Sequence, residues 1–157
     1  MNIFYVDCDP KKAARALCDR HVCKMVLETA QILCTAAAAL GQTPPYKPTH
    51  KEHPVVKWAG YSRHNFIWAL THGMELAQEY QNRYQRTHSS SRILEQASAW
   101  VLLPPDVGPT PPAQAMPEKY RGDDPVEAYR RYYIGEKASF ATWRRPSSPP
   151  LWWPEET

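Results

Sequence analysis

An amine and a carboxylate stand one helical turn apart in the first fifth of the chain. Lys24 and Glu28 are four positions apart, so on a helix they share one face. His21 lies one turn before Lys24, and Gln31 lies one turn beyond Glu28. An amine beside a carboxylate can attack C1′ of a deoxyribose and break the glycosidic bond through an imine. The same pair is also a common stabilising contact, so a purely structural ion pair remains an alternative.

The element that must position these groups is the apolar stretch over residues 19–41. Its polar side chains share a stripe about 100° wide on a helix. The stripe consists of Arg20, His21, Lys24, Glu28, Gln31 and Thr35. We expect a central buried helix over about residues 20–40, capped by Asp19 and ended by Gly41. Buried charges are costly unless they are paired or face a wet cleft, so the stripe is a salt-bridge seam or the floor of an active site.

The composition fits a single domain over residues 1–157. A net charge of +3 is compatible with a nucleic-acid partner only if basic residues cluster. The four cysteines form no CxxC motif, which favours reduced thiols in a cytoplasmic protein. A zinc site of Cys18, His21 and Cys23 has no standard ligand spacing, so we expect no metal. We also expect no signal peptide and no apolar run long enough to cross a membrane.

The rest of the sequence predicts a compact all-α bundle of five or six helices with proline-rich loops. Residues 1–6 are apolar with no local strand to pair with, so they are expected to form an extended arm on the helices. Asp9, His53 and Asp124 each precede a proline, which is a signal for the start of a helix. Further helices are expected over residues 63–86 and 88–103, and the last helix to about residue 143. Six prolines in residues 104–117 indicate a structured loop over the core.

Nine further residues are of types that contact nucleotides and lie on or beside predicted helices. They are Arg20, Gln31, His53, Trp58, Asn65, His72, Tyr129, Arg130 and Lys137. The last three belong to an aromatic and basic segment whose side chains are suited to stacking on bases and holding phosphates. Structural alternatives exist, because His53 is also placed to cap a helix and tyrosines at helical spacing usually pack in a core.

Two segments carry a family resemblance. LCDRHVCKMVLETAQIL at residues 17–33, followed by HPVVKWAGY at residues 53–61, resembles the pyrimidine-dimer DNA glycosylases of the endonuclease V type. The matching motif residues are Asp19, Arg20, His21, Lys24, Glu28 and Gln31 with the Ile-Leu that follows. The chain is also similar to a group of small uncharacterised phage proteins, through its MNIF and DCDP segments and through AQAMPEKY and AYRRYY.

The resemblance implies an all-α fold, DNA as substrate, no cofactor, and base excision with strand nicking. In the phage glycosylases the nucleophile is the amine of a processed N-terminal residue, supported by a glutamate that would be Glu28 here. Asn2 is too bulky for ordinary removal of Met1. Three alternatives therefore stay open: the Met1 amine acts, Lys24 acts, or the lyase chemistry is absent.

Three functions fit these observations. The first is a glycosylase/lyase acting on a damaged or modified pyrimidine, the second a phage enzyme that builds modified pyrimidines on the same scaffold, and the third a non-catalytic DNA-binding module. We favour the first, with catalytic roles for Glu28, Lys24, His21 and Met1. The expected partner is DNA or a nucleotide, without a membrane. The protein is expected to act as a monomer in the cytoplasm of a bacterial or phage-infected cell.

Overall fold

The structure is a computed structural model that describes residues 1–155, and this part of the chain contains helices and loops but no strand. The elements, in chain order, are α1 (Pro10–Ala16), α2 (Asp19–Ala39), α3 (Pro54–Tyr61), α4 (Arg63–Tyr84), α5 (Ser91–Ala97), the short 3-10 helix η1 (Glu118–Tyr120) and α6 (Pro125–Lys137). The predicted all-α bundle, with an extended arm before the first helix, is confirmed.

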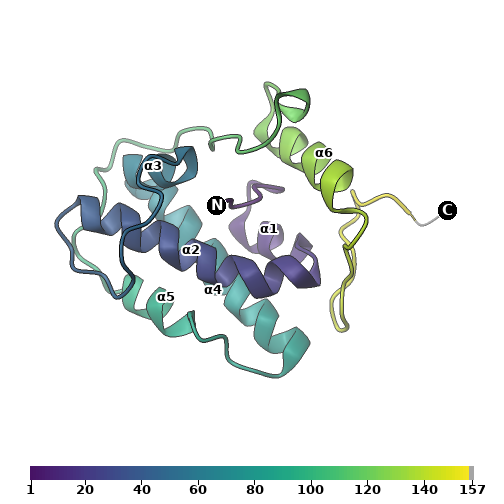
Figure 1. The fold of residues 1–157 in the computed structure, drawn as a ribbon, viewed down its shortest axis with the longest axis horizontal. Helices are drawn as coiled ribbons and strands as arrows, with labels where there is room; N and C mark the ends of the chain where they lie inside the picture. Colours follow the sequence, from purple (N-terminus) through teal and green to yellow (C-terminus); the bar gives the residue numbers. More distant parts are fainter. Residues whose placement is uncertain (156–157) are drawn as a thin grey trace.

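Helix α2 forms the centre of the bundle, as the sequence predicts. It packs against α3, α4 and α5, and α1 packs against α4 (Figure 1). Val22, Val26 and Ile32 are fully buried, which fits an apolar cylinder surrounded by other helices. Contrary to our expectation, α2 is long and apolar enough by length and composition to cross a membrane. A core helix passes the same test, and the packing of α2 inside the bundle accounts for its apolar character.

The cap-and-proline signals begin three helices where the sequence predicts them. Asp9 accepts a hydrogen bond from the N–H of Lys11, and Asp124 accepts one from Val126. His53 caps α3 in the same way through Nδ1. Gly41 has φ +92° just after the end of α2, a left-handed backbone that favours glycine. Local backbone chemistry therefore determines most helix starts in this chain.

Three predicted boundaries are wrong. Asp19 was expected to cap α2, but it is the first residue of the helix, and the cap position is occupied by Cys18 without a side-chain hydrogen bond. The carboxylate of Asp19 instead binds Arg83 of α4 and Thr142 of the tail. Helix α5 ends at Ala97 rather than residue 103, since the next N–H groups form tighter turns and two prolines follow at 104 and 105. Helix α6 ends at Lys137 rather than residue 143. The segment after it turns back to α2, where the Asp19 N–H donates to the carbonyl of Thr142.

The proline-rich segment lies on the bundle as a structured loop, as predicted. Asn65 donates to the hydroxyl of Thr110 at 2.8 Å, and its amide oxygen accepts the N–H of Thr110 at 3.1 Å. The indole of Trp58 donates to the carbonyl of Thr110 at 3.0 Å. Figure 1 shows this segment running from the α5 end of the bundle past α3 to α6. The loop thereby brings α6 to the N-terminal arm.

Candidate active site

Glu28 is the point at which the N-terminus of the chain meets the polar stripe of α2. Its Oε2 lies 3.9 Å from the amine of Met1 and accepts the N–H of Asn2 at 3.1 Å. Its Oε1 lies 3.4 Å from Nζ of Lys24. The carboxylate is 14% exposed, whereas the side chain of Lys24 is 65% exposed. The sequence-predicted pair of Lys24 and Glu28 is therefore present, and the structure adds a second amine.

Asn2 fixes the course of the N-terminal arm. Its Oδ1 accepts the N–H groups of Ile3 and Phe4 at 2.8 and 2.9 Å, and its Nδ2 donates to the carbonyl of Ala115 at 2.8 Å. The backbone of Phe4 is left-handed, with φ +47°. Such a backbone is rare outside glycine, so these contacts impose a sharp bend that returns the first residue to α2. Nothing in the residue pattern of the first six positions indicates this bend.

His21 lies on the same stripe, and the structure buries it. Its ring stacks on Phe4 with centroids 4.4 Å apart, and Nδ1 lies 2.7 Å from the hydroxyl of Tyr133. Burial, and after it the positive charges of Lys137, Lys24 and Arg20, together lower the pKa of His21 to about 3. His21 is therefore neutral at pH 7, and its contacts join α2 to the arm and to α6.

His53 lies within the electrostatic reach of the amine and carboxylate. Its Nδ1 accepts the N–H of Val55 at 3.1 Å at the start of α3. Its pKa is lowered by burial first, then by the charges of the N-terminal amine and His50, while Glu28 acts in the opposite direction. The two sequence interpretations of His53, as a cap and as a site residue, are compatible with each other in this geometry.

Two cations lie on aromatic rings beside the arm. The guanidinium of Arg20 is 4.1 Å from the ring centroid of Phe140, and Nζ of Lys137 is 5.0 Å from that of Tyr132 and 5.7 Å from that of Phe4. Neither Arg20 nor Lys137 forms an ion pair within residues 1–155. Both positive charges are thus uncompensated, which favours a phosphate as their partner.

Other predicted contact residues serve the fold. Trp58 and Asn65 hold the proline-rich loop, and both are buried. His72 is fully buried with Nδ1 3.1 Å from the carbonyl of Pro10, and burial lowers its pKa to about 4. Tyr129 is fully buried and donates to the carbonyl of Ala113.

Two further residues from that set are less enclosed. Arg130 donates to the carbonyl of Val6 at 2.9 Å and forms an ion pair with Asp7 at 3.5 Å, which fastens α6 to the arm. Gln31 is half-buried on α2, one turn beyond Glu28. Arg130 therefore has a structural role, whereas Gln31 lies on the polar stripe of α2 and remains available to a ligand near Glu28.

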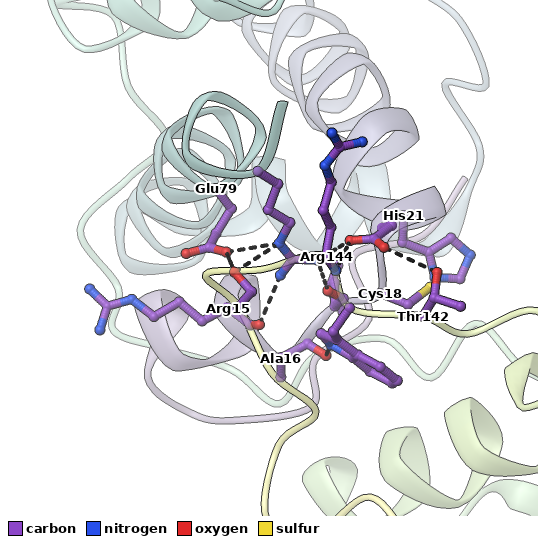
Figure 2. A network of polar contacts seen from close by, with 12 residues as sticks. Arg15, Ala16, Cys18, His21, Glu79, Thr142 and Arg144 are labelled. Atoms are coloured by element: carbon purple, nitrogen blue, oxygen red, sulfur yellow. Dashed lines mark hydrogen bonds and ion pairs between the residues drawn. The ribbon is translucent and has the colours of Figure 1, made fainter. Parts of the chain in front are cut away.

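A second polar centre lies at the first turn of α2 and joins it to the tail (Figure 2). Arg83, whose side chain is fully buried, donates to Asp19 at 3.1 Å and to Glu79 at 3.0 Å. Its remaining acceptors are Leu17 O, Arg15 O and Ser147 Oγ. Asp19 also accepts from the N–H of Arg144 and the hydroxyl of Thr142. The sequence indicated Asp19 as a helix cap and a motif residue, and its partner Arg83 had no recognisable signal.

No group of three or more His, Cys, Asp or Glu residues suited to a metal ion occurs within the described part of the chain.

The sequence model of the pyrimidine dimer DNA glycosylase family matches residues 1–91. The matched region is more than half of the 157 residues and contains Met1, Glu28 and the whole of α1 to α4. The chain belongs to this family. Comparisons with curated proteins and with solved structures gave no match. Membership implies DNA as the substrate and a glycosylase type of function at the level of the family.

Proposed function

We propose that this pyrimidine dimer DNA glycosylase family member excises a damaged or modified pyrimidine base from DNA, using the Met1 amine as nucleophile and Glu28 as proton acceptor. One observation carries the proposal. The only carboxylate oxygen within 4 Å of the N-terminal amine, in the part of the chain that the structure describes, is Oε2 of Glu28. An amine and a carboxylate at this distance are the groups that glycosidic-bond cleavage through an imine requires.

The chemistry follows from these two groups. The neutral amine nitrogen forms a bond to C1′, and the bond from C1′ to N1 of the pyrimidine breaks, so that the base leaves with the electron pair. Glu28 accepts the proton that the amine loses. Glu28 returns that proton to O4′ as the sugar ring opens and the imine forms. It then takes a proton from C2′, so that the C3′–O bond breaks and the phosphate leaves with its electron pair, which nicks the strand. Hydrolysis of the imine restores the amine.

Met1 is a better candidate nucleophile than Lys24. The side chain of Met1 is 3% exposed, which fixes its amine beside Glu28, whereas the Lys24 side chain is 65% exposed. Lys24 then acts as a charge that orients Glu28. Asn2 offers a related route, because its nitrogen lies 3.1 Å from the same oxygen and would become the amine if Met1 were removed.

The cations beside the arm provide a surface to which the DNA backbone can bind next to Glu28. Arg20 and Lys137 have no carboxylate partner within residues 1–155, so we assign them to phosphates flanking the target nucleotide. Gln31 extends the same side of α2 beyond Glu28. We further propose that residues 1–157 act as one domain and as a monomer, in the cytoplasm of a bacterial or phage-infected cell.

The test is borohydride trapping on a duplex that contains one abasic site, with intact mass measured to identify the terminal residue. Wild type should give a covalent adduct, Lys24→Ala should retain it, and a chain with a blocked N-terminal amine should lose it. If only Lys24→Ala loses the adduct, Lys24 and not the Met1 amine is the nucleophile. A wild type without an adduct would overturn the lyase chemistry.

Two product analyses separate the competing functions. Cleavage of the glycosidic bond in dimer-containing DNA, measured as free base after photoreversal of the dimer, supports excision, because the cut pyrimidine otherwise stays joined to its neighbour. A new nucleoside in digested DNA after co-expression would instead support a pyrimidine-modifying enzyme. DNA binding without either product would leave a non-catalytic module.

A further inference from the structure

We propose that His53 donates a hydrogen bond from Nε2 to the departing pyrimidine, a role that rests on the glycosylase function proposed above. Its residue type permits several roles, and the geometry selects one. This role depends on which ring nitrogen carries the proton, where the loop places the ring, and what charge the reaction creates nearby.

The start of α3 fixes the tautomer of His53. Nδ1 accepts the backbone N–H of Val55 at 3.1 Å, and a backbone amide in this position is always a donor. The lone pair of Nδ1 is therefore in use, so the neutral ring carries its proton on Nε2. Nε2 is separated from Nδ1 by Cε1, so its N–H is directed away from the amide that Nδ1 accepts. The cap thus prepares a single N–H donor.

Nε2 is open to a ligand. It makes no hydrogen bond within residues 1–155, and it is not among the buried side-chain atoms that lack a partner, which are Thr29 Oγ1 and His72 Nε2. A half-buried ring with an accessible, unused N–H differs from His72, whose unused nitrogen is sealed inside the core. The arrangement of His53 suits a contact with substrate, whereas that of His72 is structural.

A pair of hydrogen bonds to Thr35 fixes the loop that precedes His53 on the polar stripe of α2 that also carries Glu28. Thr35 accepts the N–H of Thr49 at 3.0 Å and donates to its carbonyl at 3.1 Å, which fixes the loop on α2 about 10 Å along the helix from Glu28. A turn in which the N–H of His53 donates to the carbonyl of His50 then starts α3.

The charges that act on His53 agree with this placement. They come from the Met1 amine on the arm, Glu28 on α2 and His50 in the preceding loop. Burial is the largest influence and lowers the pKa of His53, and the amine and His50 act in the same direction. The neutral donor is therefore the prevalent form at pH 7.

The reaction needs such a donor at the leaving base. When the C1′–N1 bond breaks, the electron pair passes to the pyrimidine ring and its charge is shared with the adjacent O2 carbonyl oxygen. A neutral N–H held in place can stabilise that charge without transferring its proton. Glu28 handles the proton of the amine, so the two residues act on opposite ends of the breaking bond. Water then protonates the released base.

Three variants separate the cap from the donor. His53→Asn keeps an acceptor for Val55, because Asn is among the best N-cap residues, but it removes Nε2. His53→Gln has a longer side chain whose amide can replace the Nε2 donor, and His53→Ala removes both functions. Each full-length protein is assayed for single-turnover base release from a dimer-containing duplex, measured as glycosidic-bond cleavage by photoreversal of the dimer and detection of free base. It is also assayed for borohydride trapping on an abasic duplex, which has no base to expel.

We expect His53→Asn to slow base release about 100-fold while its trapping yield stays at the wild-type level. His53→Gln should recover part of the lost rate. Wild-type base release in His53→Asn, or an equal loss in both assays, would overturn the role. A wild type that neither traps nor releases base would overturn the proposed function and this role together. If the wild type is active in both assays, the variants test His53 alone.

Discussion

The two carboxylates of α2 have opposite surroundings. Asp19 accepts hydrogen bonds from Arg83, Thr142 and Arg144, which are fixed parts of the fold. Glu28 has one backbone donor, the N–H of Asn2, and its other partners are the amine of the chain terminus and the end of an exposed lysine side chain. Asp19 is fully hydrogen-bonded within the fold, whereas Glu28 keeps two amine partners that a substrate can replace. The nature of the partners, rather than the carboxylate itself, distinguishes a structural centre from a candidate reactive one.

The sharpest way to test this contrast is to neutralise each carboxylate in turn. Glu28→Gln should lower base release and adduct formation about 10³- to 10⁴-fold, because the amine loses its proton acceptor, while the free energy of unfolding changes little. Asp19→Asn is the matched control on the same helix. It should retain the activity of the folded protein and lower its stability. Single-turnover rates and urea denaturation measure both effects, and equal losses of activity would remove the distinction.

Removal of Arg83 tests the structural centre directly. Arg83→Met should lower the free energy of unfolding by about 3–5 kcal/mol, because Asp19 and Glu79 lose their buried partner. Arg86→Met, three residues on and exposed, is the control and should change stability by less than about 0.5 kcal/mol. Urea denaturation at pH 7 compares the two. A similar small effect in both proteins would show that the network in Figure 2 contributes little to stability.

The sequence predicted the features that depend on local periodicity. The apolar pattern of residues 19–41 predicted the central helix, and the caps at Asp9, His53 and Asp124 predicted helix starts. The four-residue spacing of Lys24 and Glu28 predicted their contact. Each of these depends only on helical geometry, which is the same wherever the helix sits in the fold.

Long-range contacts account for what residue spacing did not predict, since only the family resemblance implied an N-terminal amine supported by Glu28. The Met1 amine reaches Glu28 only because Asn2 and Phe4 bend the arm, and Asn2 depends on the carbonyl of Ala115, which is 113 positions away. His21 has the spacing of a site residue, yet Phe4 and Tyr133 bury it. Such contacts arise from the path of loops over the core, which residue spacing along one helix does not encode.

His21 lies between the two carboxylates and tests which centre it belongs to. With its pKa lowered to about 3, the folded ring stays neutral while the unfolded one, with an ordinary pKa near 6.5, takes up a proton as the pH falls. The unfolded state therefore gains protons first, and His21 should cost about 2 kcal/mol of stability between pH 7 and pH 5. His21→Gln keeps a polar partner for Tyr133 and removes this titration. Urea denaturation at both pH values should show a smaller loss for the variant, since the contributions of His53 and His72 remain in both proteins. Identical losses would mean that the His21 ring takes up protons in the folded state, as a solvent-accessible residue would. His21 would then be grouped with Glu28 as a candidate site residue.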